Sequence, residues 1–301
     1  MYIIGLLKKR IKQIKIAFGG YLIKWKIDYW GIGKVGELKQ KEGELHPQII
    51  VSLTSYGRRV EKVVFYTLIS LLKQTYMPNR IILWLDNDNW NDSNIPSRLS
   101  KLKRYGIEFK FCKDLRSYKK LIPCLQHYPN DIIITVDDDV YYSTKLIKGL
   151  YDHYLKDNKS VFCYKAVYPQ FDDKGKILPY NNWSKEQEKE NIIFPVGVGG
   201  ILYPPHSLHK DVLKENLFMS LCPLADDIWF WFMAIKGMSH HKIILSEKMH
   251  HYSFDSIYQY FHKGSALTHS NSQNNKNDEQ ISNLFKYYNI ESKKDLFYHD
   301  K

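Results

Sequence analysis

The chain has 301 residues, of which 44% are hydrophobic and 15% are aromatic. This composition supports a sizeable hydrophobic core, and it excludes an intrinsically disordered chain. The four cysteines, Cys112, Cys124, Cys163 and Cys222, stand far apart without a Cys-x-x-Cys pair, which argues against a zinc ribbon or a disulfide framework. No cleavable secretory signal is recognisable, and we expect a reducing, cytoplasmic location.

The net charge of +12 suggests a nucleic-acid partner, but the charge is unevenly distributed. Residues 1–40 hold nine basic and two acidic side chains, which is more than half of the excess. In this segment lysines alternate with an apolar stripe whose members recur every three or four positions. The stripe consists of Ile4, Leu7, Ile11, Ile14, Phe18, Leu22 and Trp25. This pattern predicts a basic amphipathic helix over residues 1–30.

Lysines interrupt the predicted helix too often for it to supply the roughly 20 apolar residues that cross a bilayer. Two locations are possible for this helix. Either its apolar side packs on the protein's own core, or residues 1–26 lie on an anionic membrane surface. We expect the second, with the protein peripheral on the inner face of the cytoplasmic membrane. No nucleic-acid partner is expected, and the sequence does not indicate an oligomeric state.

Residues 31–47, rich in Gly, Lys and Glu, predict a linker that ends at Pro47. From residue 48 onward, short apolar runs alternate with helical patterns. The predicted strands cover residues 49–53, 80–85, 107–111 and 132–136, and the predicted helices cover residues 60–72, 96–104, 118–127 and 144–155. Four strand–helix units in succession predict an α/β fold, with a mostly parallel sheet covered by helices on both faces.

The second half of the chain is less regular. It has candidate strands at 160–167, 192–196 and 242–245 and a candidate helix at 227–236. We predict one domain over residues 48–264, divided into a nucleotide half (48–140) and an acceptor half (141–264). Within residues 265–301, the polar stretch up to residue 279 predicts a mobile segment before a short helix at 280–288.

Three carboxylates, Asp137, Asp138 and Asp139, directly follow the apolar strand Ile132–Val136. In extended backbone, Asp137 and Asp139 point to one side and Asp138 to the other. Two carboxylates about 4 Å apart repel by about 4 kcal/mol at an effective dielectric of 20, so we expect a cation nearby. Oxygen ligands favour Mg or Mn over zinc. The alternative is a cap for the next helix, but Ser143 stands closer to its start.

An apolar strand that runs into an Asp-x-Asp element after several strand–helix units resembles the GT-A glycosyltransferases, over roughly residues 48–255. The chain is most similar to the bacterial family 2 enzymes that build lipopolysaccharide or capsular glycans. The predicted helix 60–72, followed by Gln74-Thr75-Tyr76-Met77-Pro78, resembles the stretch of that family that leads into its second strand. The resemblance implies a GT-A fold and a nucleotide-sugar donor.

The resemblance also implies which residues contact the donor. They are Thr54, Ser55, Tyr56, Arg58, Asp114, Lys119, Lys120, Asp137 and Asp138, together with Gly199 and Gly200 near the sugar. The two lysines would neutralise the diphosphate, with a solvated helix face as the alternative. For the two glycines the alternative is a bulge or a tight turn.

By the same resemblance, Asp139 binds a Mn or Mg ion directly, Asp137 faces the ribose or a metal-bound water, and His250 or His251 adds a further metal ligand. Inverting glycosyltransferases need a carboxylate that takes the proton of the acceptor hydroxyl, and the family carries it in an acidic pair. Asp227 is the predicted base and Asp226 its partner. The alternative role of this pair is to complement a helix dipole, which explains one acid better than two.

These residues predict a metal-dependent, inverting glycosyltransferase that moves one sugar from a nucleotide-sugar donor, most simply a UDP-sugar, to a lipid-linked or cell-surface glycan. We find neither a second Asp-x-Asp element nor a Gln-x-x-Arg-Trp-type motif, which disfavours a processive synthase. The alternatives are a sugar nucleotidyltransferase of related fold, a metal-dependent nucleic-acid-processing enzyme, and a membrane-binding scaffold whose acids are structural. For the nucleotidyltransferase, Ser55–Arg59 would make a poor phosphate loop.

Overall fold

The structure is a computed structural model of the whole chain, and it describes residues 2–38, 47–186, 192–245, 252–254 and 275–297, with side chains from residue 15 onward. The predicted ligands His250 and His251 therefore lie outside the described residues. The same holds for residues 39–46 of the predicted linker and for residues 265–274 of the predicted mobile segment.

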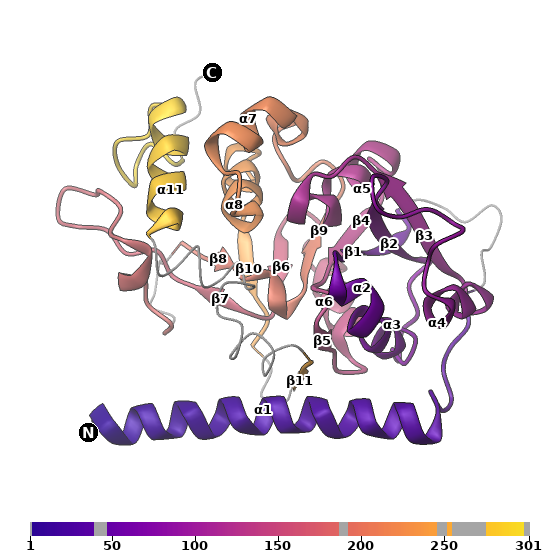
Figure 1. Cartoon of the computed structure of the whole chain (residues 1–301). Helices are drawn as coiled ribbons and strands as arrows, with labels where there is room; N and C mark the ends of the chain where they lie inside the picture. Colours follow the sequence, from indigo (N-terminus) through magenta and orange to yellow (C-terminus); the bar gives the residue numbers. More distant parts are fainter. Residues whose placement is uncertain (1, 39–46, 187–191, 246–251, 255–274, 298–301) are drawn as a thin grey trace.

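A seven-stranded sheet in the order β10-β6-β9-β4-β1-β2-β3 forms the centre of the molecule (Figure 1). β1 lies between β4 and β2 and is parallel to both, and β3 is parallel to β2. β9 runs antiparallel to β4 and β6. The predicted α/β fold with a mostly parallel sheet is confirmed. The strands are β1 (Ile49–Thr54), β2 (Arg80–Asp86), β3 (Ile107–Cys112), β4 (Ile132–Thr135), β6 (Val161–Cys163), β9 (Ile201–Tyr203) and β10 (His241–Ile243).

The central strands have near-continuous apolar sequences because both of their faces are buried. Val51 and Leu53 of β1 belong to a hydrophobic core on one face of the sheet. Ile50 of β1 and Trp84 of β2 belong to a second core on the other face. Alternate residues of one strand thus contribute to opposite layers, as the pleat requires.

Helices cover both faces of this sheet (Figure 1). Every residue of α3 is buried, and its apolar side chains belong to the first core. All but two of the eleven residues of α8 are buried, and its apolar side chains belong to the second. The α-helices are α1 (Tyr2–Trp30), α2 (Arg58–Lys62), α3 (Val64–Leu71), α4 (Ser97–Ser100), α5 (Ile122–His127), α6 (Leu146–Tyr154), α7 (Glu215–Leu221), α8 (Asp226–Lys236) and α11 (Lys276–Tyr287), and the 3-10 helices are η1 (Lys101–Tyr105), η2 (Arg116–Lys120), η3 (Tyr180–Asn182), η4 (Gly197–Gly199) and η5 (Lys210–Leu213).

Three predicted helices are divided in the structure. The helix predicted at 60–72 breaks at Val63, whose φ of −126° is outside the helical range. The helix predicted at 118–127 is a 3-10 turn followed by α5, because Pro123 lacks an N–H and is accommodated only in a first helical turn. The helix predicted at 96–104 continues from α4 as the 3-10 helix η1.

Two small antiparallel sheets were not predicted. β5 (Val140–Tyr141) pairs with β11 (Tyr252–Ser253), and β7 (Ala166–Val167) pairs with β8 (Phe194–Pro195). The first of these pairs begins directly after the three aspartates and lies near α1 in Figure 1. It therefore joins the carboxyl-terminal part of the chain to the end of β4.

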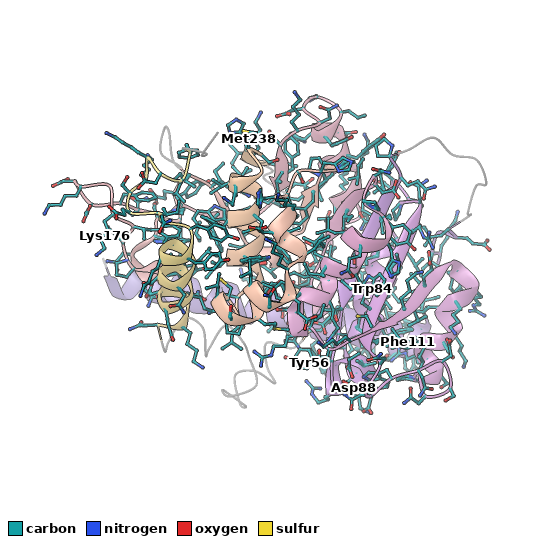
Figure 2. The ribbon with its side chains drawn as sticks, turned by 90° about the horizontal axis from the view of Figure 1, so that it is seen from above. Tyr56, Trp84, Asp88, Phe111, Lys176 and Met238 are labelled. Atoms are coloured by element: carbon teal, nitrogen blue, oxygen red, sulfur yellow. The ribbon has the colours of Figure 1, made fainter. Side chains whose placement is uncertain are left out.

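The carboxyl ends of the parallel strands meet at one edge of the sheet. In Figure 2, Tyr56, which follows β1, and Asp88, which follows β2, both lie along this edge. Met238, which follows α8, lies on the opposite side of the molecule. The amino-terminal end of α8 is therefore directed toward the edge where ligands bind in such sheets.

Candidate active site

Asp138, in the middle of the three aspartates after β4, accepts hydrogen bonds from three side chains. Its buried carboxylate accepts hydrogen bonds from Ser55 (Oγ to Oδ2, 2.6 Å) and from Arg59 (Nη1 to Oδ1, 2.7 Å). Its backbone carbonyl accepts a hydrogen bond from Thr67 Oγ1 of α3 at 2.8 Å. Burial raises the pKa of Asp138, and the charge of Arg59 opposes the rise. Asp138 thereby connects β1, α2 and α3 to the end of β4.

Asp137 and Asp139 contact different partners. The expectation that they share one side required extended backbone, but β4 ends before them and the chain turns at residues 138–139. Asp139 contacts the guanidinium of Arg59 (Oδ2 to Nη2, 3.2 Å). Asp137 lies 3.6 Å from Nζ of Lys120 instead. Burial raises the pKa of Asp137, and Lys120 opposes that rise.

Lys120 lies between acidic residues from two distant parts of the chain. Its Nζ is 3.6 Å from Asp137 Oδ1, 2.8 Å from Asp226 Oδ2 and 3.3 Å from Asp227 Oδ1. Its backbone carbonyl accepts a hydrogen bond from Ser52 Oγ of β1, which fixes the end of η2 against the sheet. Burial lowers the pKa of Lys120, but the three carboxylates outweigh it and hold the pKa well above its usual value.

Asp226 and Asp227 form the first turn of α8. The backbone N–H of Gly197 donates a hydrogen bond to Asp227 Oδ2 at 3.1 Å. Burial raises the pKa of Asp227 to about 6; Lys120 opposes this rise, and Asp226 adds to it. A carboxylate that is ionised at neutral pH but accepts a proton readily is suited to general-base catalysis. The structure thus brings the predicted acidic pair to the aspartates after β4.

Asp114 and Lys119 form a second ion pair at this edge of the sheet. Lys119 Nζ contacts Asp114 Oδ1, which also accepts a hydrogen bond from the backbone N–H of Arg116 at 2.9 Å. Burial raises the pKa of Asp114, but these two donors outweigh it, and the pKa lies below its usual value. Lys119 is 2% exposed and Lys120 is 6% exposed, so neither lies on a solvated helix face.

The residues after β1 separate into two groups. Ser55 is buried against Asp138, whereas Tyr56 and Arg58 are exposed. Arg59, and not the predicted Arg58, contacts the aspartates, and its guanidinium carbon lies 5.6 Å from the centre of the Tyr56 ring. The hydroxyl of Thr54 donates a hydrogen bond to the carbonyl of Trp84 on the neighbouring strand. Nucleotide contacts by Thr54, Tyr56 and Arg58 stay predictions.

The glycine segment before β9 has local structural reasons for its composition. A Cβ at Gly199 would lie 2.8 Å from Cβ of Lys165, and Gly200 has a φ of +83°. These facts support the structural alternative, in which Gly199 allows two chain segments to approach closely and Gly200 forms a tight turn. A contact of either glycine with the donor stays a prediction. Gly197 lies in the site itself, because a Cβ there would lie 3.0 Å from both Asp227 Oδ1 and Lys120 Nζ.

The chemistry of these acids fits a divalent cation. The ion pairs among the described residues of this cluster join five carboxylates to two cationic side chains. The carboxylates belong to Asp137–Asp139 and Asp226–Asp227, and the cations are Arg59 and Lys120. No group of three or more His, Cys, Asp or Glu arranged for a metal occurs in the described part of the chain. Mg²⁺ commonly binds one or two carboxylates together with water and substrate phosphates, a role that Asp137 and Asp139 suit.

Three contributors were not singled out from the sequence. Arg59 was passed over for its neighbour, and nothing in the pattern distinguishes the two. Gly197 stands two positions before the predicted Gly199, but the hydrogen bond from its amide depends on the position of α8. Tyr142 is buried, and its hydroxyl oxygen accepts a hydrogen bond from the backbone N–H of Asp137 at 2.9 Å. A tyrosine five residues beyond the strand end gives no sequence signal.

The carboxyl-terminal part of the chain contacts the backbone at one group of acids and just before the other. The N–H of Phe254, next to β11, donates a hydrogen bond to the carbonyl of Asp139 at 2.8 Å. Gln280 of α11 accepts a hydrogen bond from the N–H of Leu224, two residues before α8. The predicted last helix is confirmed, and it begins four residues earlier than expected.

Solved structures that resemble this chain include S. aureus TarS 1–349, with a TM-score of 0.47 and 16% identity over 80% of this chain and 72% of that chain. TarS 1–349 in complex with UDP has a TM-score of 0.46 and 16% identity, over 70% of this chain and 62% of that chain. The present chain therefore spans less than two thirds of the length of that TarS chain. CMP:2-keto-3-deoxy-manno-octonic acid synthetase complexed with CTP has a TM-score of 0.44 and 11% identity, over 73% of this chain and 98% of that chain. No curated protein matches the chain.

A family model gives the decisive comparison. Residues 51–217, more than half of the chain, match the model of glycosyl transferase family 2. The matched segment runs from β1 to α7 and includes Asp114, Lys120 and the three aspartates after β4. The chain belongs to glycosyl transferase family 2.

Proposed function

We propose that the enzyme transfers a single sugar, with inversion at the anomeric carbon, from a nucleotide-sugar donor to a hydroxyl group of a glycan. The observation that carries this proposal is the position of Lys120. Its Nζ lies 3.6 Å from Asp137, at the end of β4, and 3.3 Å from Asp227, at the start of α8. A donor-side acid and a prospective base thus meet at one nitrogen, as a reaction on one anomeric carbon requires.

The donor is proposed to be a UDP-sugar. The pairing edge of uracil presents one N–H donor between two carbonyl acceptors, whereas cytosine presents an acceptor at the same ring position. The ion pair of Asp114 and Lys119 offers a carboxylate acceptor beside an ammonium donor, which complements uracil. Tyr56, whose side chain is 45% exposed at the same edge, offers an aromatic surface for a base or sugar ring.

Asp227 is the proposed base. As the acceptor oxygen attacks the anomeric carbon, its proton passes to the Asp227 carboxylate. The bond between the anomeric carbon and the phosphate oxygen breaks, and the nucleoside diphosphate leaves with the electron pair. The hydrogen bond from the Gly197 amide holds the carboxylate in place during this step. Its pKa of about 6 leaves it ionised at neutral pH.

Asp137 and Asp139 are the proposed ligands of a Mn²⁺ or Mg²⁺ ion, whose charge would stabilise the departing diphosphate. Arg59 contacts both Asp138 and Asp139 and thereby fixes the turn that presents Asp139. Lys120 keeps Asp137 and Asp227 close despite their like charges. Among the alternatives, nucleotidyl transfer and nucleic-acid processing lose support because the family model matches residues 51–217.

The acceptor is proposed to be a lipid-linked or cell-surface glycan, reached from the inner face of the cytoplasmic membrane through residues 1–26. No described helix combines the length and apolar character needed to span a bilayer. The support for a surface location is that Phe18, Leu22 and Trp25, members of the apolar stripe found in the sequence, are exposed instead of packed on the core.

Binding and hydrolysis assays test this function. Thermal shifts measured with UDP, GDP and duplex DNA, each with and without Mn²⁺, should show stabilisation by UDP that grows with Mn²⁺. Asp139→Ala should lose the Mn²⁺-dependent part. Donor hydrolysis across a panel of nucleotide sugars then identifies the sugar. Stabilisation by DNA without any response to nucleotides would overturn the proposal.

A further inference from the structure

Helix α1 presents two different faces. On the inner face Gly20 and Ile27 are buried, and Ile23 packs against the first hydrophobic core. The outer face carries six of the fourteen exposed large hydrophobic side chains of the described residues, each 40% to 72% exposed. This outer face consists of Phe18, Tyr21, Leu22, Trp25, Tyr29 and Trp30.

The inner face of α1 contacts the rest of the protein at two places. A Cβ at Gly20 would lie 2.5 Å from the carbonyl oxygen of Ser253, so α1 and β11 approach as closely as only glycine permits. Near the end of the helix, the carboxylate of Asp28 accepts hydrogen bonds from the Tyr66 hydroxyl and the Arg98 guanidinium. These contacts prevent a rotation of α1 that would bury its outer face.

The composition of the outer face identifies its environment. Trp and Tyr combine an apolar ring with a polar group, and they concentrate where hydrocarbon meets lipid headgroups. Trp25 and Tyr29 stack with ring centres 5.6 Å apart, which makes a continuous aromatic surface. Lys15 and Lys26, both exposed, stand on the same helix and suit anionic headgroups.

We infer that the outer face of α1 enters the interfacial region of an anionic lipid bilayer, with the helix axis parallel to the membrane. This inference rests on the membrane location proposed above, and it does not depend on the sugar-transfer reaction. A single helix on the side of the molecule (Figure 1) offers a convex surface, which suits a bilayer better than a peptide partner. Exposed lysines on the same helix disfavour contact with a second copy of this basic chain.

The attachment of the inner face gives the bound enzyme a fixed orientation. β11 pairs with β5, and the N–H of Phe254 donates a hydrogen bond to Asp139. Only two short strands therefore separate α1 from the turn that carries the proposed metal ligand. The membrane plane and the acidic edge of the sheet are held in one arrangement.

Vesicle binding by the full-length chain tests the inference. The probe is phosphatidylcholine vesicles with and without phosphatidylglycerol, and the variant is Phe18→Ser/Leu22→Ser/Trp25→Ser. We expect binding to anionic vesicles to fall by at least about tenfold, because three interfacial contacts are lost. The matched control, Met238→Ser/Leu245→Ser, removes two exposed apolar side chains elsewhere and should bind like the wild type.

A second measurement does not depend on the stability of the triple variant. Brominated lipids should quench part of the wild-type tryptophan fluorescence, and the conservative variant Trp25→Phe/Trp30→Phe should lose that quenching while binding equally well. Unchanged binding of the triple variant, or no quenching in the wild type, overturns the inference. So does a wild-type dimer in sedimentation velocity that the triple variant converts to a monomer, because the face would then be a self-association surface. Vesicle binding without donor hydrolysis would contradict only the proposed reaction.

Discussion

Two acidic groups meet at the edge of the sheet, and they are held in different ways. The carboxylate of Asp138, in the group after β4, accepts hydrogen bonds from two side chains, the hydroxyl of Ser55 and the guanidinium of Arg59. Asp227, at the start of α8, accepts one backbone hydrogen bond, from Gly197, and shares the ammonium of Lys120 with two other carboxylates. Among the described residues, the guanidinium beside Asp138 is shared with one other carboxylate, that of Asp139, whereas the ammonium beside Asp227 is shared with two.

This difference gives the same side chain two chemical roles. The two side-chain donors directed at Asp138 oppose the rise that burial causes in its pKa, and they suit this carboxylate to holding the turn and the nearby guanidinium in place. Burial beside other acids favours the protonated form, so Asp227 is suited to accepting a proton. The environment, and not the residue type, separates the two groups. Each prediction below tests one side of this contrast.

The largest effect is expected at the base. Asp227→Asn keeps the shape of the side chain but removes the proton acceptor, so kcat for sugar transfer should fall by about a thousandfold. Donor binding, measured by calorimetry, should change little, because the donor-side acids are untouched. Asp173→Asn, at an exposed site, is the matched control. Full turnover by Asp227→Asn would show that the base lies elsewhere.

Asp138→Asn should instead act on stability. It removes a buried charge and leaves the Arg59 guanidinium without one of its partners, so the free energy of unfolding should fall by about 3 kcal/mol. Urea denaturation measures the change. Asp92→Asn breaks an exposed ion pair with Lys103 and should stay within about 1 kcal/mol of the wild type. Equal effects in both variants would remove the structural role assigned to Asp138.

The adjacent lysines allow a sharper comparison. Lys120→Met removes the cation that opposes the raised pKa of Asp227, so the midpoint of the pH–rate profile should move upward and activity at pH 7 should fall by about tenfold. Lys119→Met should weaken donor binding and leave the midpoint unchanged, because Lys119 contacts Asp114 instead. Equal midpoints in the two variants would contradict the bridging role of Lys120.

The wild-type pH dependence should show two opposite trends. Activity, measured as kcat/KM, should rise as Asp227 ionises around pH 6 and then level off. For stability the sign is reversed. The folded-state pKa of Asp227 lies above its usual 3.8, so the folded protein binds more protons than the unfolded chain, and the contribution of this group to stability falls as pH rises from about 4 to 6. Asp227→Asn should lose both trends.

The sequence predicted the parts of the molecule that depend on local pattern. Continuous apolar runs identified β1 to β4, because strands buried on both faces need them. The aspartates after β4 and the pair at the start of α8 were found as acids at the ends of apolar elements. The structure brings both groups to Lys120.

The parts that the sequence missed depend on distant contacts. β9 has three residues, and nothing local shows that it enters the middle of the sheet in the reverse direction. Lys120 and Asp227 are 107 positions apart, so their contact follows only from the packing of η2 against α8. The selection of Arg59 over Arg58 depends on which side of α2 faces Asp138. The membrane role of α1 and the donor contacts stay predictions.

The contacts of the carboxyl-terminal part have a consequence for gene truncation. Phe254 donates its amide hydrogen to Asp139, and Gln280 accepts that of Leu224 just before α8. A premature stop codon before residue 252 would therefore remove a support from each acidic group, although the family match ends at residue 217. A gene fragment cut to the matched segment should yield a protein without an intact acidic edge.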